Sequence, residues 1–236
     1  MSKQIKSKKR VTDHGEVFTN EREVKAMCDL VKDETERIDS RFLEPACGNG
    51  NFLSEILQRK LEVCKKQYRK SPFDYERNSI LALTSIYGVE LLKDNVDACI
   101  NRLYEIWNTE YTRVCKSEAN DICRESALYI LQHNILCGNA LSLMRVDDKG
   151  KNTEEPIIFA EWSFVMGDKL KRRDFRLDVL LKENEDETMY NTQMSLFADS
   201  ADYNRYWEID PVTKETIPKP VKEYPITDYR RIAQYE

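Results

Sequence analysis

Histidine and paired cysteines are scarce in this sequence of 236 residues. Only His14 and His133 are present, and none of the seven cysteines lies in a Cys-x-x-Cys pair. Structural zinc sites are usually built from such pairs and from histidines, so we expect no metal site. Scattered cysteines also give no disulfide framework, which favours a reducing compartment.

Long apolar runs are missing as well. No stretch approaches the roughly 20 apolar residues that a membrane-spanning helix needs. The N-terminus is polar and basic, and no apolar segment of the signal-peptide type follows it. We therefore expect a cytoplasmic protein without membrane contact.

Positive charge is not in excess, because the sequence has 37 Lys and Arg residues but 42 Asp and Glu residues, for a net charge of -5. Any contact with nucleic acid would have to come from local patches. Two basic runs qualify, residues 3–10 (KQIKSKKR) and residues 169–176 (KLKRRDFR). Such a run is more often a solvated face than a track for phosphates.

Apolar runs and amphipathic segments do alternate along residues 20–142. The apolar residues recur with helical spacing in four segments: 20–38, 51–68, 93–107 and 118–132. Short apolar runs bounded by turn residues predict strands at 41–44, 86–91 and 134–141. This alternation predicts an α/β fold with a parallel sheet.

The parts outside this domain follow different patterns. Residues 1–19 are interpreted as a basic tail and loop, and residues 143–236 as an insertion or extension. Within the latter, the apolar stretch 157–166 predicts a β-hairpin, and three prolines from Pro218 to Pro225 predict an extended course before a short helix.

The stretch RFLEPACGNGNFL, residues 41–53, places Gly48 and Gly50 between a predicted strand and a predicted helix. Glycines at this point let the backbone approach a ligand closely. A Gly-x-Gly pair alone is as often a purely local turn, but its position favours a ligand loop. Glu90 ends the next strand, where a carboxylate can accept hydrogen bonds from two ribose hydroxyls.

The segment EPACGNGNFL resembles the S-adenosylmethionine loop of adenine-N6 DNA methyltransferases of the restriction-modification type, whose usual form is D-P-A-C-G-S-G-x-F. Residues 15–27 (GEVFTNEREVKAM) are similar to the G-x-x-x-T-P segment of that family. The resemblance covers about residues 11–142. It implies a Rossmann-like sheet of the class I methyltransferases, S-adenosylmethionine as cofactor, and methyl transfer to an adenine flipped out of DNA.

The resemblance also implies a set of cofactor-binding residues. They are Thr19 at the methionine carboxylate, Glu44 at the amine, Pro45, Ala46, Gly48, Gly50 and Phe52 in the loop, Glu90 at the ribose, and Asn139 near the adenine amino group. Asn139 stands where the family usually has aspartate, and its amide oxygen can still accept a hydrogen bond. Asn20 replaces the family's proline, and Glu44 is one methylene longer than the usual aspartate.

The largest departure from the family is the missing catalytic tetrapeptide, N-P-P-Y or D-P-P-Y, which follows the fourth strand and holds the target amino group. None of the seven prolines lies beside another. We therefore expect the first three strands of the sheet and no catalytic residue in this chain. A second polypeptide is expected to supply the tetrapeptide and the region that recognises DNA.

Two other functions remain open. The chain could be a non-catalytic or decayed subunit that holds S-adenosylmethionine or DNA, or part of a methyltransferase with a substrate other than DNA. Two residues carry weaker functional interpretations: Cys47 as a nucleophile and Trp162 as a base-stacking platform. For both, a place in the apolar core is the more common alternative.

Overall fold

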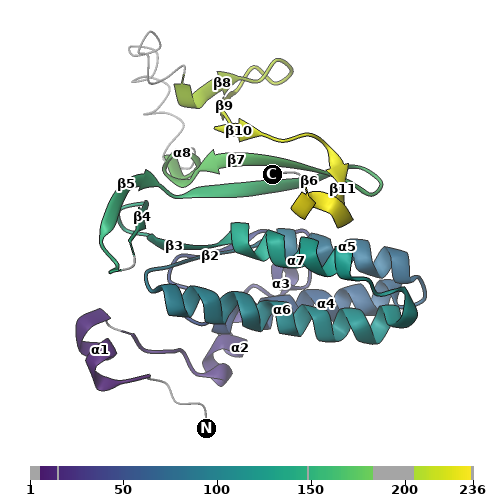
Figure 1. The fold of residues 1–236 in the computed structure, drawn as a ribbon, viewed down its shortest axis with the longest axis horizontal. Helices are drawn as coiled ribbons and strands as arrows, with labels where there is room; N and C mark the ends of the chain where they lie inside the picture. Colours follow the sequence, from purple (N-terminus) through teal and green to yellow (C-terminus); the bar gives the residue numbers. More distant parts are fainter. Residues whose placement is uncertain (1–5, 15, 148, 183–204, 235–236) are drawn as a thin grey trace.

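The computed structural model describes residues 6–14, 16–147, 149–182 and 205–234 (Figure 1). A five-stranded sheet has the order β1-β2-β3-β4-β5. Its strands are β1 (Phe42–Glu44), β2 (Ile86–Glu90), β3 (Ile135–Asn139), β4 (Met144–Val146) and β5 (Asn152–Pro156). The first three are parallel, which confirms an α/β fold.

The sheet is larger than the three expected strands, because β4 and β5 extend it and pair antiparallel to their neighbours. A tight turn, closed by a hydrogen bond of 2.8 Å from the Leu143 N–H to the Asn139 carbonyl, joins β3 to β4. Parallel strands need a crossover of a dozen or more residues, and this turn is too short for one. The sheet thus continues past residue 142, where the sequence suggested a boundary.

The helices around the sheet are α1 (Lys8–His14), α2 (Glu21–Leu30), α3 (Lys32–Thr35), α4 (Asn51–Tyr68), α5 (Pro72–Thr84), α6 (Lys93–Cys115) and α7 (Asp121–Asn134), with the 3-10 turn η1 (Lys116–Glu118). The predicted helix 20–38 is interrupted at Val31, whose backbone leaves the helical region. The basic tail, expected to be a loop, contains α1. Ser71 caps α5 by accepting a hydrogen bond from the Asp74 N–H, and Pro72 begins the helix.

A second sheet is built around the long hairpin of β6 (Ile158–Met166) and β7 (Lys169–Arg176), which confirms the predicted hairpin. Figure 1 shows this hairpin lying above the helices. The remaining elements are α8 (Leu177–Lys182), β8 (Trp207–Ile209), β9 (Thr216–Pro218), β10 (Lys222–Glu223), β11 (Thr227–Asp228) and η2 (Tyr229–Gln234). The extended C-terminal course and its short helix are therefore also confirmed.

The two parts of the chain share one apolar core. Ile157, Phe159, Trp162 and Tyr229 belong to the same buried cluster as Leu53. The Trp162 indole N–H also donates a hydrogen bond of 2.8 Å to the Asn134 side chain. Trp162 is therefore a core residue, with no face open for stacking on a base.

A buried carboxylate fixes the C-terminal segment to the helices. Glu76 is only 3% exposed and accepts hydrogen bonds from the hydroxyls of Tyr111 and Tyr229 and from the Arg230 guanidinium. Charged hydrogen bonds of this kind are the strong ones in proteins. The segment that follows Pro225 is thus held on α5 and α6.

A buried lysine joins α4 to the segment that leads into β1. The Lys60 side-chain nitrogen contacts four oxygen atoms, the carbonyls of Arg37, Ile38 and Ser40 and the hydroxyl of Ser85. Burial lowers the pKa of Lys60 to about 7. In an unfolded chain the pKa is about 10.4, so the fold favours the neutral amine.

Lys60→Met is expected to remove the pH dependence that this amine gives to stability. Between pH 7 and about 10 the unfolded chain binds one more proton than the native chain. The free energy of unfolding therefore rises with pH by up to about 1.4 kcal/mol per unit. The variant also loses about 1–3 kcal/mol because buried carbonyls lose their donor.

Urea unfolding of both proteins at several pH values measures this effect. Burial raises the pKa of the Cys64 and Cys115 thiols to about 12, so these cysteines release protons in this range only when the chain unfolds. The informative quantity is therefore the difference between wild type and variant. Lys66→Met, on the exposed face of the same helix, is the matched control and should keep the wild-type slope. A Lys60→Met slope equal to the control's would exclude a neutral Lys60.

No helix in the described ranges is both long and apolar enough to cross a membrane.

Candidate cofactor site

The glycine loop is a tight turn between β1 and α4. Gly48 and Gly50 have positive φ angles of 52° and 84°, in the left-handed region that favours glycine. A Cβ on Gly50 would lie 2.7 Å from the Cys99 sulfur, so no larger residue fits there. Hydrogen bonds from the Cys47 N–H to the Val89 carbonyl (3.0 Å) and from the Gly50 N–H to the Cys47 carbonyl (2.8 Å) close the turn.

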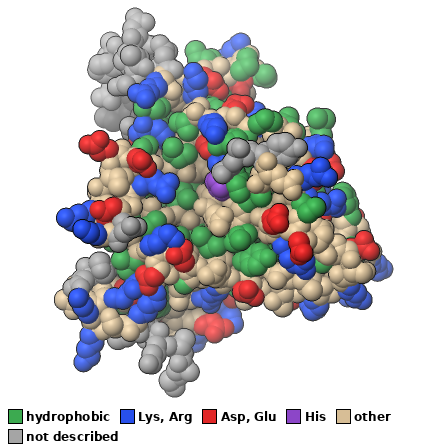
Figure 2. All heavy atoms as spheres, viewed as in Figure 1, with side chains coloured by type: hydrophobic (Ala, Val, Ile, Leu, Met, Phe, Trp, Pro, Cys, Tyr) green, Lys and Arg blue, Asp and Glu red, His purple; other side chains and the backbone are tan. Residues whose placement is uncertain are grey.

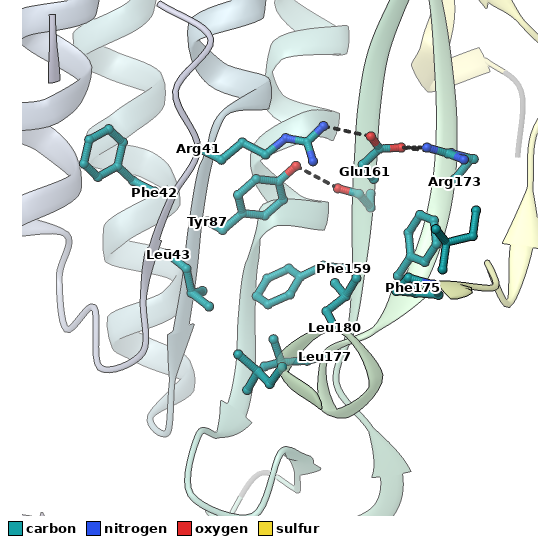
Figure 3. A pocket seen from close by; sticks show the side chains of 14 residues that line it. Arg41, Phe42, Leu43, Tyr87, Phe159, Glu161, Arg173, Phe175, Leu177 and Leu180 are labelled. Atoms are coloured by element: carbon teal, nitrogen blue, oxygen red, sulfur yellow. Dashed lines mark hydrogen bonds and ion pairs between the residues drawn. The ribbon is translucent and has the colours of Figure 1, made fainter. Parts of the chain in front are cut away.

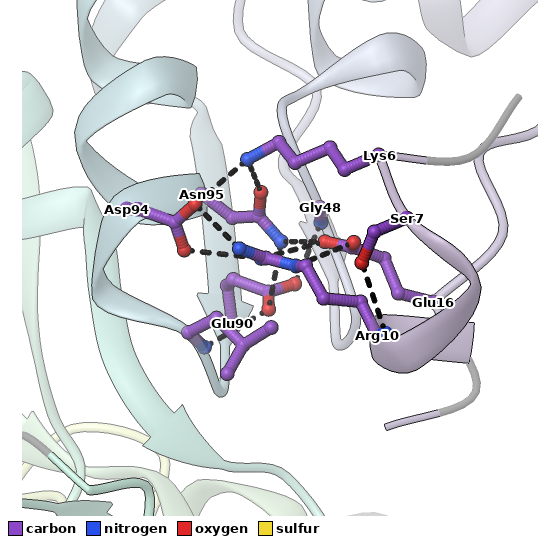
Figure 4. A network of polar contacts seen from close by, with 9 residues as sticks. Lys6, Ser7, Arg10, Glu16, Gly48, Glu90, Asp94 and Asn95 are labelled. Atoms are coloured by element: carbon purple, nitrogen blue, oxygen red, sulfur yellow. Dashed lines mark hydrogen bonds and ion pairs between the residues drawn. The ribbon is translucent and has the colours of Figure 1, made fainter. Parts of the chain in front are cut away.

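Glu90, at the end of β2, contacts this loop (Figure 4). One carboxylate oxygen, Oε2, accepts a hydrogen bond of 2.9 Å from the Gly48 N–H. The other, Oε1, accepts from the Leu92 N–H (3.0 Å) and from the Asn95 amide (3.4 Å). A carboxylate has about four acceptor positions. One position on Oε2 therefore remains for a ligand hydroxyl, and a second hydroxyl would have to displace Asn95.

The N-terminal segment lies beside Glu90 through a network of charged contacts (Figure 4). Arg10 forms hydrogen bonds with Glu16 and Asp94, and Asn95 donates a hydrogen bond of 2.7 Å to Glu16. Lys6 contacts both Asp94 and Asn95. No pattern in the sequence indicates this role, because the contacts join segments some 80 residues apart.

Both carboxylates of the network stay ionised at neutral pH. The hydrogen bond from Arg10 holds the pKa of Asp94 well below its usual range. Burial alone would raise the pKa of Glu16, but hydrogen bonds from Arg10 and Asn95 lower it overall. The network is therefore an array of fixed charges around Glu90 rather than a neutral cluster.

A cavity of about 280 Å³ lies between the start of α2 and the glycine loop, and Thr19, Asn49, Ser54 and Arg102 are among the residues that line it. The side-chain oxygens of Asn49 and Ser54 are buried there without a hydrogen-bond partner among the described residues. Leaving a buried polar group unpaired costs about 1–3 kcal/mol. Both residues line the cavity, so a rotation of their side chains would let a polar ligand there bond to these oxygens.

Thr19 is brought to the loop, as the resemblance implied. Its carbonyl accepts a hydrogen bond of 2.9 Å from the Asn51 amide, and Arg102 donates to the Asn51 amide oxygen. Ser54 and Arg102 were missed by the sequence reasoning. A serine on the apolar face of α4 was the available signal for Ser54, and Arg102 gave none.

The other loop residues differ in their surroundings. Glu44 is half-buried, and burial raises its pKa although a hydrogen bond from the Ala46 N–H opposes the shift. Pro45 and Ala46 are exposed. Phe52 packs against a small apolar cluster of Val24, Cys28 and Ile56. Its position is explained by packing without a ligand.

Asn139 shapes the turn between β3 and β4. Its side-chain oxygen accepts hydrogen bonds from the N–H groups of Leu141 (2.9 Å) and Ser142 (3.4 Å), and its amide donates to Asn152. Asparagine commonly stabilises turns in this way. The residue does lie at the same sheet edge as Glu90, but both lone pairs of its oxygen are already used. Its contact with an adenine amino group stays a prediction.

Cys47 does not have the environment of a nucleophile. It is only 6% exposed, and a hydrogen bond with Cys99 together with burial raises the pKa of its thiol far above the usual value. Reactive cysteines need the thiolate. The buried, protonated thiol fits the apolar filler that was the more common alternative.

The basic run 169–176 forms ion pairs with nearby carboxylates. The pairs are Lys169–Asp228, Lys171–Glu223, Arg172–Asp174, Arg173–Glu161 and Arg176–Asp178. Figure 2 shows basic and acidic side chains interspersed over one face of the molecule. In the other run, Lys6 and Arg10 pair with Asp94, while residues 3–5 lie outside the described residues. The run 169–176 is therefore not an open track for phosphates.

Among the residues that the structure describes, no three or more His, Cys, Asp or Glu side chains are placed to hold a metal ion.

In comparisons with known proteins, no family model, no curated protein and no solved structure matches this chain. The function of the site therefore has to be inferred from its geometry and from the motif in the loop.

Proposed function

We propose that this chain binds S-adenosylmethionine at the carboxyl ends of β1 and β2, on a Rossmann-like sheet of the class I methyltransferases. One observation carries the proposal. The glycine loop, held by Glu90 through a hydrogen bond of 2.9 Å, lies beside a cavity in which the oxygens of Asn49 and Ser54 have no described partner.

The chemistry of these residues fits the cofactor. Arg102 carries a positive charge at the cavity that suits the methionine carboxylate. Asn49 and Ser54 offer acceptors for the ammonium group, and the serine can also donate. Glu90 keeps one acceptor position for a ribose hydroxyl. When bound, the cofactor supplies a methyl group on a sulfonium centre.

The proposed reaction is adenine-N6 methylation of DNA within a restriction-modification system. The sequence of the loop supports adenine in DNA as the substrate, since EPACGNGNFL resembles the motif of the adenine-N6 DNA methyltransferases. We propose that a second polypeptide carries N-P-P-Y or D-P-P-Y and the DNA-recognition region. The ion pairing of the run 169–176 supports this division, because it leaves that run few free positive charges for phosphates.

A subunit that holds the cofactor without turnover is a second candidate. The absence of adjacent prolines favours it, because no catalytic tetrapeptide can be present in this sequence. Both candidates require the same cofactor site and differ only in methyl transfer by the assembled protein.

Ser54→Ala is expected to weaken S-adenosylmethionine binding about tenfold or more, because the cofactor loses a hydrogen bond to a charged group. Stability should stay unchanged or rise, since the substitution removes a buried hydroxyl without a partner. Calorimetric titration of cofactor into wild type and variant measures the first effect, and urea unfolding the second.

Ser126→Ala is the matched control, because the Ser126 hydroxyl is also buried and unpaired among the described residues but lies in α7, away from the cavity. It should leave cofactor binding unchanged. Equal binding by Ser54→Ala and wild type would remove the cavity from the proposed site. No binding by wild type at millimolar cofactor would contradict the proposal itself.

A further inference from the structure

β1 presents a backbone edge that has no partner within the described residues. β1 pairs only with β2 there, and the Phe42 N–H donates a hydrogen bond of 2.9 Å to the Ser85 carbonyl. In a parallel pair, alternate residues direct both backbone groups toward the same neighbour. Phe42 and Glu44 therefore face β2, and the N–H and C=O of Leu43 face away. Such an edge is a template for another strand.

An apolar groove of about 460 Å³ lies beside this edge (Figure 3). Its walls come from β1, the β6–β7 hairpin and α8, with Leu43, Phe159, Phe175, Leu177 and Leu180 among the lining side chains. The Leu43 side chain is 41% exposed. Leu181, which also lines the groove, is 42% exposed, whereas Phe159, Phe175 and Leu177 are buried. The exposed leucines therefore lie over a buried apolar floor, which suits the side chains of a bound segment.

The floor of the groove is fixed by specific contacts. The Tyr87 ring meets the Phe159 ring edge-on, with 5.3 Å between ring centroids, and the Tyr87 hydroxyl donates a hydrogen bond of 3.0 Å to the Ala160 carbonyl. The groove is therefore formed before anything binds, which lowers the entropy cost of binding.

One end of the groove carries excess positive charge. Arg41 and Arg173 both pair with the single carboxylate of Glu161, at 2.8 Å and 2.9 Å. Burial alone would raise the pKa of Glu161, but the hydrogen bond from Arg41 and the charge of Arg173 lower it. Two guanidinium groups thus face one carboxylate, and the Arg41 side chain is 55% exposed. An acidic group on a ligand would complete the charge balance.

We propose that the Leu43 edge and the adjoining groove bind a β-strand of a second polypeptide, with apolar side chains in the groove and an acidic residue beside Arg41. The backbone of that strand pairs with the free N–H and C=O of Leu43. This second polypeptide is the one proposed above to carry the catalytic tetrapeptide, and its role in methyl transfer rests on that proposed function. The test of strand binding needs no cofactor, so either proposal can fail alone.

A second copy of this chain fits the edge less well. In an antiparallel pair centred on Leu43, Arg41 of one copy would lie opposite Pro45 of the other. Proline has no N–H to donate, so the pairing would end there. A small apolar molecule could fill the groove but would leave the Leu43 backbone groups unpaired. A strand from a different chain satisfies both the backbone and the groove.

Hydrogen exchange of the backbone amides, followed by NMR on the full chain, tests whether the Leu43 backbone groups are unpaired in the monomer. In the monomer, the Leu43 amide is expected to exchange at least about tenfold faster than the Phe42 amide, which is bonded to Ser85. Sedimentation at the same concentration verifies that the sample is monomeric.

A capped probe peptide, Asp-Thr-Ile-Thr-Val-Thr, added to about 5 mM, tests whether the Leu43 edge and the groove bind a strand. Saturable binding should slow exchange of the Leu43 amide at least fivefold and shift the signals of the groove residues. A peptide with Lys in place of Asp, and one N-methylated at Ile and Val, should both bind more weakly. Leu43→Asp should abolish the effect, and Leu141→Asp, at a site 97% exposed outside the groove, should not.

Several results would overturn the proposal. A protected Leu43 amide in the monomer would mean that the chain covers its own edge. Protection that grows with dimerisation would identify a second copy as the occupant. No response at 5 mM peptide, or shifts that Leu43→Asp does not affect, would show that the edge takes no strand of this chemistry.

Discussion

Glu90→Ala is expected to weaken S-adenosylmethionine binding by about 100-fold or more. A ribose hydroxyl bonded to a charged acceptor contributes about 1.5–3 kcal/mol, which alone corresponds to about tenfold to 100-fold. The remaining loss comes from the loop, because the N–H groups of Gly48 and Leu92 both donate to this carboxylate. Without it, the backbone that faces the cofactor is no longer held in place.

Calorimetric titration at a temperature where circular dichroism shows both proteins folded measures the loss. Glu90→Gln is informative beside it, because the amide keeps one acceptor oxygen and should retain part of the affinity. Asp97→Ala removes an exposed carboxylate from α6, the helix that follows Glu90 in the sequence, and is the matched control. If wild type and Glu90→Ala bind the cofactor equally, Glu90 has no part in the site.

The three parallel strands and α4 could be predicted because each depends on local pattern. Apolar runs at residues 41–44, 86–91 and 134–141 became β1, β2 and β3 within one or two residues. The segment 51–68 became α4 with the same bounds, since its apolar residues have a 3.6-residue period and Gly50 precedes it. In parallel sheets the carboxyl ends of strands share one edge, so the meeting of Gly48 and Glu90 followed.

Elements whose conformation depends on distant contacts or turn chemistry were not predicted. The start of α5 at Ser71-Pro72 is not among the predicted helices, because the same two residues also favour turns. The helix expected over 20–38 ends early at Val31, where the backbone is no longer helical. The direction of β4 is fixed by the length of the turn at Asn139, which periodicity does not reveal.

The candidate site likewise contains residues that local sequence patterns predict and residues that only distant contacts bring together. Motif spacing placed the glycines and Glu90, whose roles depend on the backbone and on strand ends. Asn95 lies in no motif and Glu16 stands at a variable position of the segment 15–27, and their contact of 2.7 Å joins two separate segments. Only the folded chain brings such residues together.

The purified chain is expected to transfer no methyl group to DNA, even with S-adenosylmethionine bound. Transfer to adenine requires a group that holds the amino nitrogen against the sulfonium and a ring that stacks on the flipped base. The sequence contains no N-P-P-Y or D-P-P-Y. Incorporation of tritium from labelled cofactor into unmethylated DNA measures the activity.

Gly48→Val is the control for this assay, because Gly48 has φ +52° and a Cβ there would lie 3.2 Å from the Phe18 ring. Wild type should show no more incorporation than this variant. Activity clearly above it would require an acceptor site within residues 143–236, where Asp168, Asp174 and Trp162 are the polar and aromatic candidates. The Asp174 carboxylate accepts hydrogen bonds from two nitrogens of the Arg172 guanidinium, and Trp162 is only 4% exposed, so neither is open to a base. Asp168→Ala would then be the first variant to make, and loss of the activity in it would place the acceptor site at the β6–β7 turn.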